Sequence, residues 1–215
     1  MEKEFEKICF QGLSFFGRMN RVISHEFKNI FAIISESLGL LDELMEMSQS
    51  GAKLPPGKLK SISESVLEEI GRANAVARNM NAFAHSVDEI ACDVEVAQLI
   101  ELMVNLARLS SLSKNIEIKF EKNSSYPVYT IPFFLEHLIY NVLSFSLAHA
   151  GSDKTIEISL EPKDKSARII FSGIEKNLSE PFPSEQIKSV AEALSAEISP
   201  DLPGELHIVV PEHMG

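Results

Sequence analysis

The chain has no tryptophan, only two cysteines, and no G-x-G sequence among its ten glycines. Cys9 and Cys92 lack the spacing of a disulfide framework or a zinc site, so we expect free thiols, as in a reducing compartment. The six histidines show no metal-ligand spacing either. No apolar run approaches the roughly 20 residues that cross a bilayer, and no signal peptide opens the chain. These absences predict a cytoplasmic protein without a membrane segment or a metal site.

Positive charge is also scarce. Lysine and arginine together number 20 against 31 acidic residues, which gives a formal net charge of −11. Because neutralising a phosphate backbone requires clustered lysine and arginine, we expect no nucleic-acid partner. The hydrophobic share of 45% is ordinary for a globular protein, and 215 residues suit one larger domain or two small ones.

Proline is absent from about Glu4 to Met47, and apolar residues recur there every three or four positions. This pattern predicts an amphipathic helix of about 40 residues, about 60 Å long. The segment Ser50–Gly57 interrupts it, and a second periodic segment follows, so the two predict an antiparallel hairpin. The stripes comprise Phe16, Met19, Ile23, Ile30, Ile34, Leu38, Leu41 and Met45, then Ile62, Val66, Ile70, Ala73, Ala77, Met80 and Ala84.

A single hairpin cannot bury apolar residues along both of its seams. A second copy is the natural cover, and two hairpins form a four-helix bundle with a twofold axis. Counting outward from the turn places His25 level with about Asn79 to Phe83 and facing outward.

The pattern changes after Cys92, and helices then alternate with short strands. We expect an α+β protein with a helical hairpin domain at 1–90 and a two-layer α/β sandwich at 91–215. The boundary lies near Ile90–Asp93. The expected helices are 94–109, 132–150 and 184–197, and the expected extended segments are 115–120, 126–129, 155–160, 167–171 and 205–210.

The segment Ser24-His25-Glu26-Phe27-Lys28-Asn29 places chemically useful groups within the first helix. His25 and Asn29 are four residues apart, so both can address one ligand. Glu26 can orient the imidazole or take a proton, and Lys28 can neutralise phosphate, although a solvated lysine is the ordinary alternative. The ordinary alternative for His25 is an exposed histidine on a dimer helix.

This segment resembles the phosphoacceptor box of bacterial sensor histidine kinases, S-H-E-x-x-N/T-P. Ile30 stands where the family has proline, which predicts a straighter helix. The second domain resembles the GHKL-type ATP-binding domain of the same family, most clearly from Tyr129 to Ala150.

The residues that the family uses for ATP are replaced in this chain. Asn141 matches the first asparagine of the family's L-x-N-L-L-x-N-A helix, but the second, a Mg²⁺ ligand, falls on Phe145, which offers no oxygen. The family's D-x-G-x-G is matched at 171–175, with Ser172 in place of the adenine-reading aspartate and one glycine left. No glycine-rich loop follows, so we expect no ATP binding and no intrinsic cofactor.

The resemblance implies a homodimeric two-component protein that acts as a histidine phosphotransferase. His25 would accept a phosphoryl group from a response regulator's aspartate and return it to another, with Glu26 and Asn29 assisting. Mg²⁺ would come with the regulator's receiver domain, and an upstream histidine kinase is a further expected partner. Alternatives are a regulator phosphatase using Glu26 and Asn29, a non-enzymatic binding dimer and a working autokinase.

Overall fold

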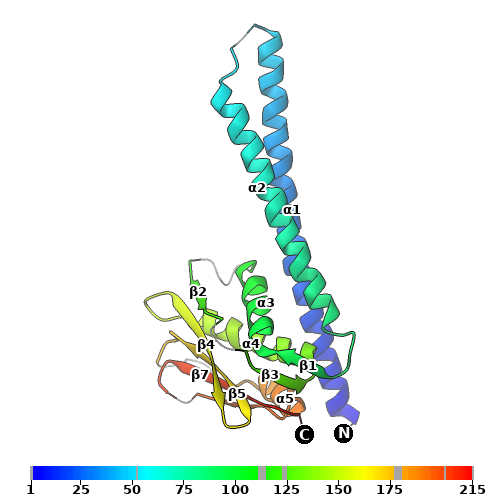
Figure 1. Ribbon diagram of the computed structural model, residues 1–215, viewed down its shortest axis with the longest axis vertical. Coiled ribbons are helices and arrows are strands. Elements are labelled where there is room, and N and C mark those ends of the chain that lie inside the picture. Colours follow the sequence, from blue (N-terminus) through cyan, green and yellow to red (C-terminus); the bar gives the residue numbers. More distant parts are fainter. Residues whose placement is uncertain are drawn as a thin grey trace. The chain divides into compact units, whose positions relative to one another are not determined.

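The computed structural model describes residues 2–51, 53–110, 115–122, 125–176, 181–200 and 202–214. None of the described helices contains an apolar stretch of the length that a membrane span needs. Helices and strands follow one another as shown in Figure 1. The helices are α1 (Glu2–Gln49), α2 (Pro56–His85), α3 (Val96–Arg108), α4 (Pro132–Ala148) and α5 (Glu185–Ala193). The strands are β1 (Cys92–Glu95), β2 (Glu117–Phe120), β3 (Pro127–Thr130), β4 (Thr155–Lys163), β5 (Ser166–Ser172), β6 (Glu197–Ser199) and β7 (Glu205–Pro211).

The chain divides into two compact units. One contains residues 20–81, and the other combines residues 1–19 with 82–215. This division differs from the expected domains, 1–90 and 91–215, because the first turns of α1 and the end of α2 pack with the sandwich. The packing there depends on the buried Phe15 of α1 and Phe83 of α2.

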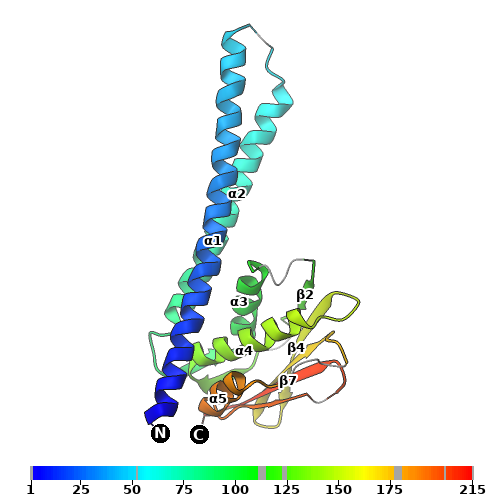
Figure 2. The same ribbon diagram turned by 180° about the vertical axis from the view of Figure 1, so that it is seen from behind.

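The smaller unit is an antiparallel pair of helices, as the periodicity predicts. Within this unit the buried apolar residues are Ile23, Ile30 and Leu44 on α1, and Ile62 and Val76 on α2. Figure 2 shows that α2 begins well short of the point where α1 ends, with the connecting segment lying between.

The expected level of His25 along α2 is wrong. Glu26 forms an ion pair with Arg72, so this part of α1 lies level with Arg72 and not with Asn79 to Phe83. The counting assumed two helices meeting at a tight turn. Helix α1 instead continues to Gln49 and α2 starts only at Pro56, so the adjoining ends of the two helices are not level (Figure 2).

The larger unit contains a five-stranded sheet in the order β2-β4-β5-β7-β6. Strand β2 is parallel to β4, and the other neighbours are antiparallel. Alternate residues of the central strands are buried, as in Ala167, Ile169 and Phe171 of β5. Helices α3, α4 and α5 cover this face of the sheet (Figure 1). The α+β class and the two-layer sandwich are therefore confirmed.

Sequence analysis did not predict two short strands. Val94 was expected in a helix but belongs to β1, which pairs antiparallel with β3. Glu197 was expected at the end of a helix, but α5 ends at Ala193 and Glu197 begins β6. Strands of three or four residues are too short to show a two-residue period. Pro132 lies in the first turn of α4, as expected.

Candidate functional site

His25 is exposed on α1, one helical turn before Asn29. The Asn29 amide nitrogen lies 3.2 Å from Nδ1 of His25, so the i, i+4 relation expected from the sequence is present as a direct contact. With the amide nitrogen facing the ring, Nδ1 accepts this hydrogen bond, an orientation that matches the neutral tautomer protonated on Nε2. Asn29 does not contact Nε2, the ring nitrogen farther from the backbone.

Glu26 is buried, unlike the adjacent His25. Its side chain is only 8% exposed, and its carboxylate accepts a hydrogen bond from Nη2 of Arg72 on α2. Nη1 of Arg72 donates at 3.2 Å to each carboxylate oxygen of Glu69. Burial lowers the pKa of Arg72, but the two carboxylates outweigh it and hold the pKa above its usual value. The structure thus directs Glu26 toward Arg72.

The row of buried residues on α1 is bordered by one edge on each side. Positions advance by about 100° per residue, so His25 and Asn29 lie beyond one edge and Phe31 and Leu38 beyond the other. Phe31 is 58% exposed and Leu38 is 48% exposed. The apolar stripe that the sequence predicts is therefore partly uncovered in a single chain, on the edge of α1 away from His25. Other exposed apolar residues of this unit are Met45, Met47, Leu67, Ile70 and Met80.

The expected metal-ligand position on α4 is occupied by an aromatic cluster. The ring of Phe145 stacks on His149, with centroids 4.2 Å apart, and contacts Phe182, with centroids 4.8 Å apart. Asn141, one turn earlier, is half-buried. Among the described residues, no group of three or more histidine, cysteine or acidic side chains could hold a metal ion.

The position where the resemblance would put the adenine-reading aspartate also carries a phenyl ring. Counting back from Gly173, the D-x-G pattern places the aspartate at Phe171, not at Ser172 as expected. Phe171 is fully buried on the helix-covered face, whereas the Ser172 hydroxyl donates to the carbonyl of Glu157 on β4. Successive side chains of β5 point to opposite faces of the sheet, so of these two residues only Phe171 lies on the face that the helices cover.

The remaining glycine serves the packing of the strand ends. Gly173 has φ +91°, and a Cβ there would lie 2.1 Å from the carbonyl oxygen of Thr155. The neighbouring amides are also engaged: Gly151 N–H donates to Gly173 O at 2.8 Å, and Glu175 N–H donates to His149 O at 2.9 Å. These N–H groups already have partners and do not form a phosphate cradle of the kind that glycine-rich loops provide.

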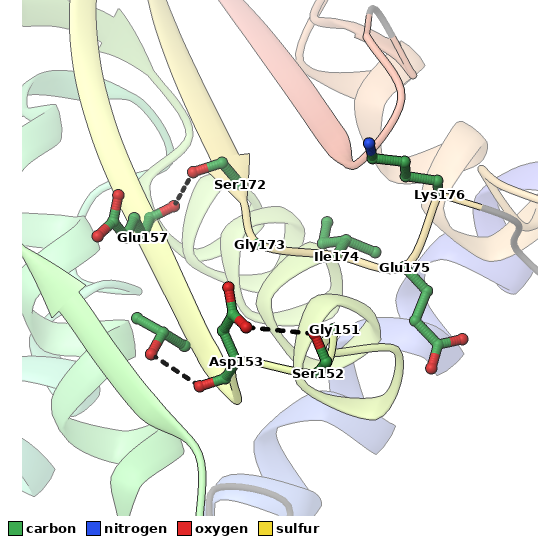
Figure 3. Close-up of a pocket in the computed structure, with 10 residues that line it drawn as sticks. Gly151, Ser152, Asp153, Glu157, Ser172, Gly173, Ile174, Glu175 and Lys176 are labelled. Carbon is green, nitrogen blue, oxygen red and sulfur yellow. Dashed lines mark hydrogen bonds between the residues drawn. The ribbon is translucent and has the colours of Figure 1, made fainter.

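An open cleft of about 630 Å³ lies beside this segment (Figure 3). Asp153, Glu157 and Glu175 give it three carboxylates, and Lys176 gives it one cation. The Ser152 hydroxyl donates to Asp153, which leaves a polar surface with internal hydrogen bonds. Its charge does not suit a nucleoside phosphate.

Sequence analysis missed Arg72 and Glu69. Both lie in the second periodic segment, where charged residues normally indicate a solvated helix face. The only available signal was their spacing of three residues, which is common to many exposed pairs. Their importance depends on the register of α2 against α1, which the sequence did not specify. Two of the three predicted site residues, His25 and Asn29, do lie together.

No protein-family model matches the chain, and no curated protein matches it. Several solved structures are similar to it. One is a bacterial phosphotransferase with 14% identity and a TM-score of 0.49, and the match covers 92% of this chain and 95% of that one. Another is the histidine kinase AdeS of Acinetobacter baumannii, with 13% identity, a TM-score of 0.43 and coverage of 87% and 98%. The catalytic domain of histidine kinase ThkA is similar over 58% of this chain and 99% of that one, with 14% identity and a TM-score of 0.47.

Proposed function

We propose that this chain is a two-component signalling protein, a histidine phosphotransferase that relays a phosphoryl group through His25 without using ATP. The observation that carries the proposal is the exposed imidazole of His25 held at Nδ1 by Asn29. This contact fixes the ring on the helix surface and leaves Nε2 open to a docking protein. The donor and acceptor would be aspartates of response regulator receiver domains.

The transfer requires a lone pair on Nε2. In the reactive tautomer the ring proton has moved from Nε2 to Nδ1 by exchange with water, and a half-turn of the Asn29 amide lets its oxygen accept a hydrogen bond from Nδ1–H. The Nε2 lone pair then attacks phosphorus, an N–P bond forms, and the P–O bond to the aspartate breaks, with the electron pair returning to the carboxylate. The phosphorylated ring is cationic at this point, and it releases the Nδ1 proton to water. The reverse sequence delivers the phosphoryl group to a second regulator. The regulator's own carboxylates would supply the Mg²⁺ that neutralises the phosphate oxygens.

Formation of a homodimer is part of the proposal. The exposed stripe containing Phe31 and Leu38 is too apolar for a solvated helix face, and a second hairpin would cover it in a four-helix bundle. His25 lies beyond the opposite edge of the buried row on α1, so such a bundle leaves it accessible. Each dimer would then present two phosphoacceptor histidines.

Two observations support independence from ATP. Phe145 stands where a metal ligand is expected, and Phe171 fills the adenine-reading place. Burying a charged nucleotide against phenyl rings without hydrogen-bonding partners costs free energy. A phosphoryl group would therefore enter from a phosphorylated partner, such as a regulator or an upstream histidine kinase.

A regulator phosphatase is the second candidate. The exposed amide of Asn29 favours it, because an amide near an aspartyl phosphate can orient an attacking water molecule. The two activities separate by substitution. If the protein is a phosphotransferase, His25→Ala abolishes transfer. If it is a phosphatase, His25→Ala leaves the activity in place, whereas Asn29→Ala removes it. A non-enzymatic binding dimer predicts that neither substitution changes the flow of phosphate.

The experiment is a transfer assay with a phosphorylated receiver domain and 32P label. The proposal predicts acid-labile label on the wild type and none on His25→Ala. Ser35→Ala is a control that removes an exposed side chain further along α1 and should retain label. Label that persists on His25→Ala would overturn the proposal.

A further inference from the structure

Three charged side chains meet between α1 and α2, one residue along from His25. Arg72 donates to Glu26 through Nη2 and to Glu69 through Nη1. The carboxylates are nearly buried, with side chains 8% and 11% exposed, whereas 43% of the Arg72 side chain is exposed. One guanidinium thus satisfies two carboxylates that would otherwise be buried without a counter-charge, a costly arrangement.

The position of Glu26 around α1 gives this pairing a consequence for His25. Glu26 lies at the edge of the buried row that borders His25 and Asn29, and its side chain has enough torsional freedom to turn toward solvent on that edge. There its carboxylate could accept the Nδ1 proton of His25. Pairing with Arg72 directs the carboxylate to α2 instead, and Asn29 contacts Nδ1.

We propose that Arg72 is a positioning residue for the chemistry at His25: it holds Glu26 against α2 and thereby restrains the reactivity of the histidine. This inference deepens the proposed phosphotransfer function and rests on it. An amide partner can donate to or accept from Nδ1, so it supports either neutral tautomer of the ring. A carboxylate can only accept, so it would favour the tautomer with the proton on Nδ1 and the lone pair on Nε2. Only that tautomer can attack phosphorus through Nε2.

The first test reads the tautomer of His25 directly in the unphosphorylated dimer by 15N NMR of the imidazole nitrogens. Arg72→Met removes the guanidinium and keeps a long side chain. The expected result is a shift of the neutral ring toward the form protonated on Nδ1. The shift should disappear in Arg72→Met/Glu26→Gln, because the released carboxylate is then absent. Identical ring signals in wild type and Arg72→Met would overturn the inference.

Lys60→Met is the matched control. Lys60 also lies on α2 and forms an ion pair with Glu64, but both side chains are exposed and the pair lies within one helix. Its loss should leave the His25 signals unchanged. A change equal to that in Arg72→Met would show a general effect of lost charge and would contradict the positioning role.

The second test measures single-turnover transfer from a phosphorylated receiver domain. Arg72→Met should transfer several-fold to about tenfold faster than wild type, and the gain should vanish with Glu26→Gln, since a correctly placed proton acceptor contributes by such factors or more. A purely structural ion pair predicts the opposite, slower transfer whether or not Glu26 is present. That result would overturn the inference.

A variant that retains the positive charge keeps the inference testable if Arg72→Met fails to fold. If Arg72→Met loses helical circular dichroism, Arg72→Lys keeps a cation, but a single ammonium group cannot reproduce the two-sided contact of the guanidinium. A partial shift in the same direction is expected, and its absence would contradict the proposal. Failure of the proposed function is distinguishable, because wild type without any transfer would contradict that function while the tautomer measurement still tests Arg72.

Discussion

The imidazole of His137 stacks on the phenyl ring of Phe15, with centroids 4.5 Å apart and planes inclined by 14°. The two residues come from α4 and the beginning of α1. Phe15 also contacts Phe83 edge-on at 5.5 Å, so one ring joins three helices. The first turns of α1 are thereby attached to the sandwich by an aromatic core, within one compact unit.

Truncating this ring should destabilise the protein strongly. We expect Phe15→Ala to lower the free energy of unfolding by about 3–5 kcal/mol, because a fully buried phenyl ring is lost and a cavity remains. Urea unfolding measures the change. Phe10→Ala, on the same helix but with a side chain 72% exposed, should stay within about 0.5 kcal/mol of wild type. Equal effects of the two substitutions would contradict the packing described.

Two neighbouring buried groups on α4 should make stability depend on pH. Burial raises the pKa of Glu136 from 4.5 to about 8, against a hydrogen bond with Ser86 that lowers it. Burial, with a smaller effect of the Arg18 charge, lowers the pKa of His137 from 6.5 to about 4. The folded protein therefore holds Glu136 protonated and His137 neutral near pH 6.

The signs of the two contributions differ. Above pH 4.5 the unfolded chain releases the Glu136 proton while the folded chain keeps it, so this contribution falls as the pH rises to about 8. The unfolded chain binds a proton at His137 below pH 6.5, so that contribution falls as the pH drops to about 4. Each slope is at most about 1.4 kcal/mol per pH unit. Urea unfolding at pH 6 and pH 8 measures the change in the free energy of unfolding. Between these pH values Glu136→Gln should lose less of this free energy than wild type. Equal losses in the two proteins would contradict the burial of Glu136.

Charge on the exposed apolar stripe should prevent dimerisation. We expect Leu38→Glu to convert a dimer into a monomer, because a carboxylate would be buried in the bundle without a partner. Light scattering coupled to size-exclusion chromatography measures the mass. Glu36→Lys reverses a charge two turns beyond Asn29, on the edge occupied by His25, and should remain dimeric. A Leu38→Glu dimer would rule out this stripe as the interface.

Nucleotide should leave the protein unaffected. A ligand that binds only the folded state stabilises it by RT ln(1 + L/Kd), where L is the free ligand concentration, so the melting temperature rises with ligand concentration. Because Phe145 and Phe171 stand where the resemblance would put the metal ligand and the adenine-reading aspartate, Mg-ATP at millimolar concentration should not shift the wild-type melting temperature. Differential scanning fluorimetry measures this, and a concentration-dependent increase would revive the autokinase alternative.

Much of this architecture could be predicted from local patterns. The proline-free periodicity of α1 and the pairing of His25 with Asn29 depend only on helix geometry, and both are present. The level of α2 against α1 depends on where each helix stops, which the interrupting segment does not encode. The partnership of Glu26 with Arg72 follows from that level, so it could not be predicted. Phe171 was missed for a different reason, since strand alternation decides which of two adjacent residues faces the helices.

Whether His25 carries a phosphoryl group is tested by label transfer from a phosphorylated receiver domain to wild type and to His25→Ala. Phosphotransfer through His25 predicts acid-labile, base-stable label on the wild-type dimer and none on His25→Ala, with both proteins equally folded. Faster loss of phosphate from the regulator without any label on the protein would contradict phosphotransfer and favour a phosphatase. Equal label on both proteins would place the phosphoryl group on another residue and contradict phosphotransfer through His25.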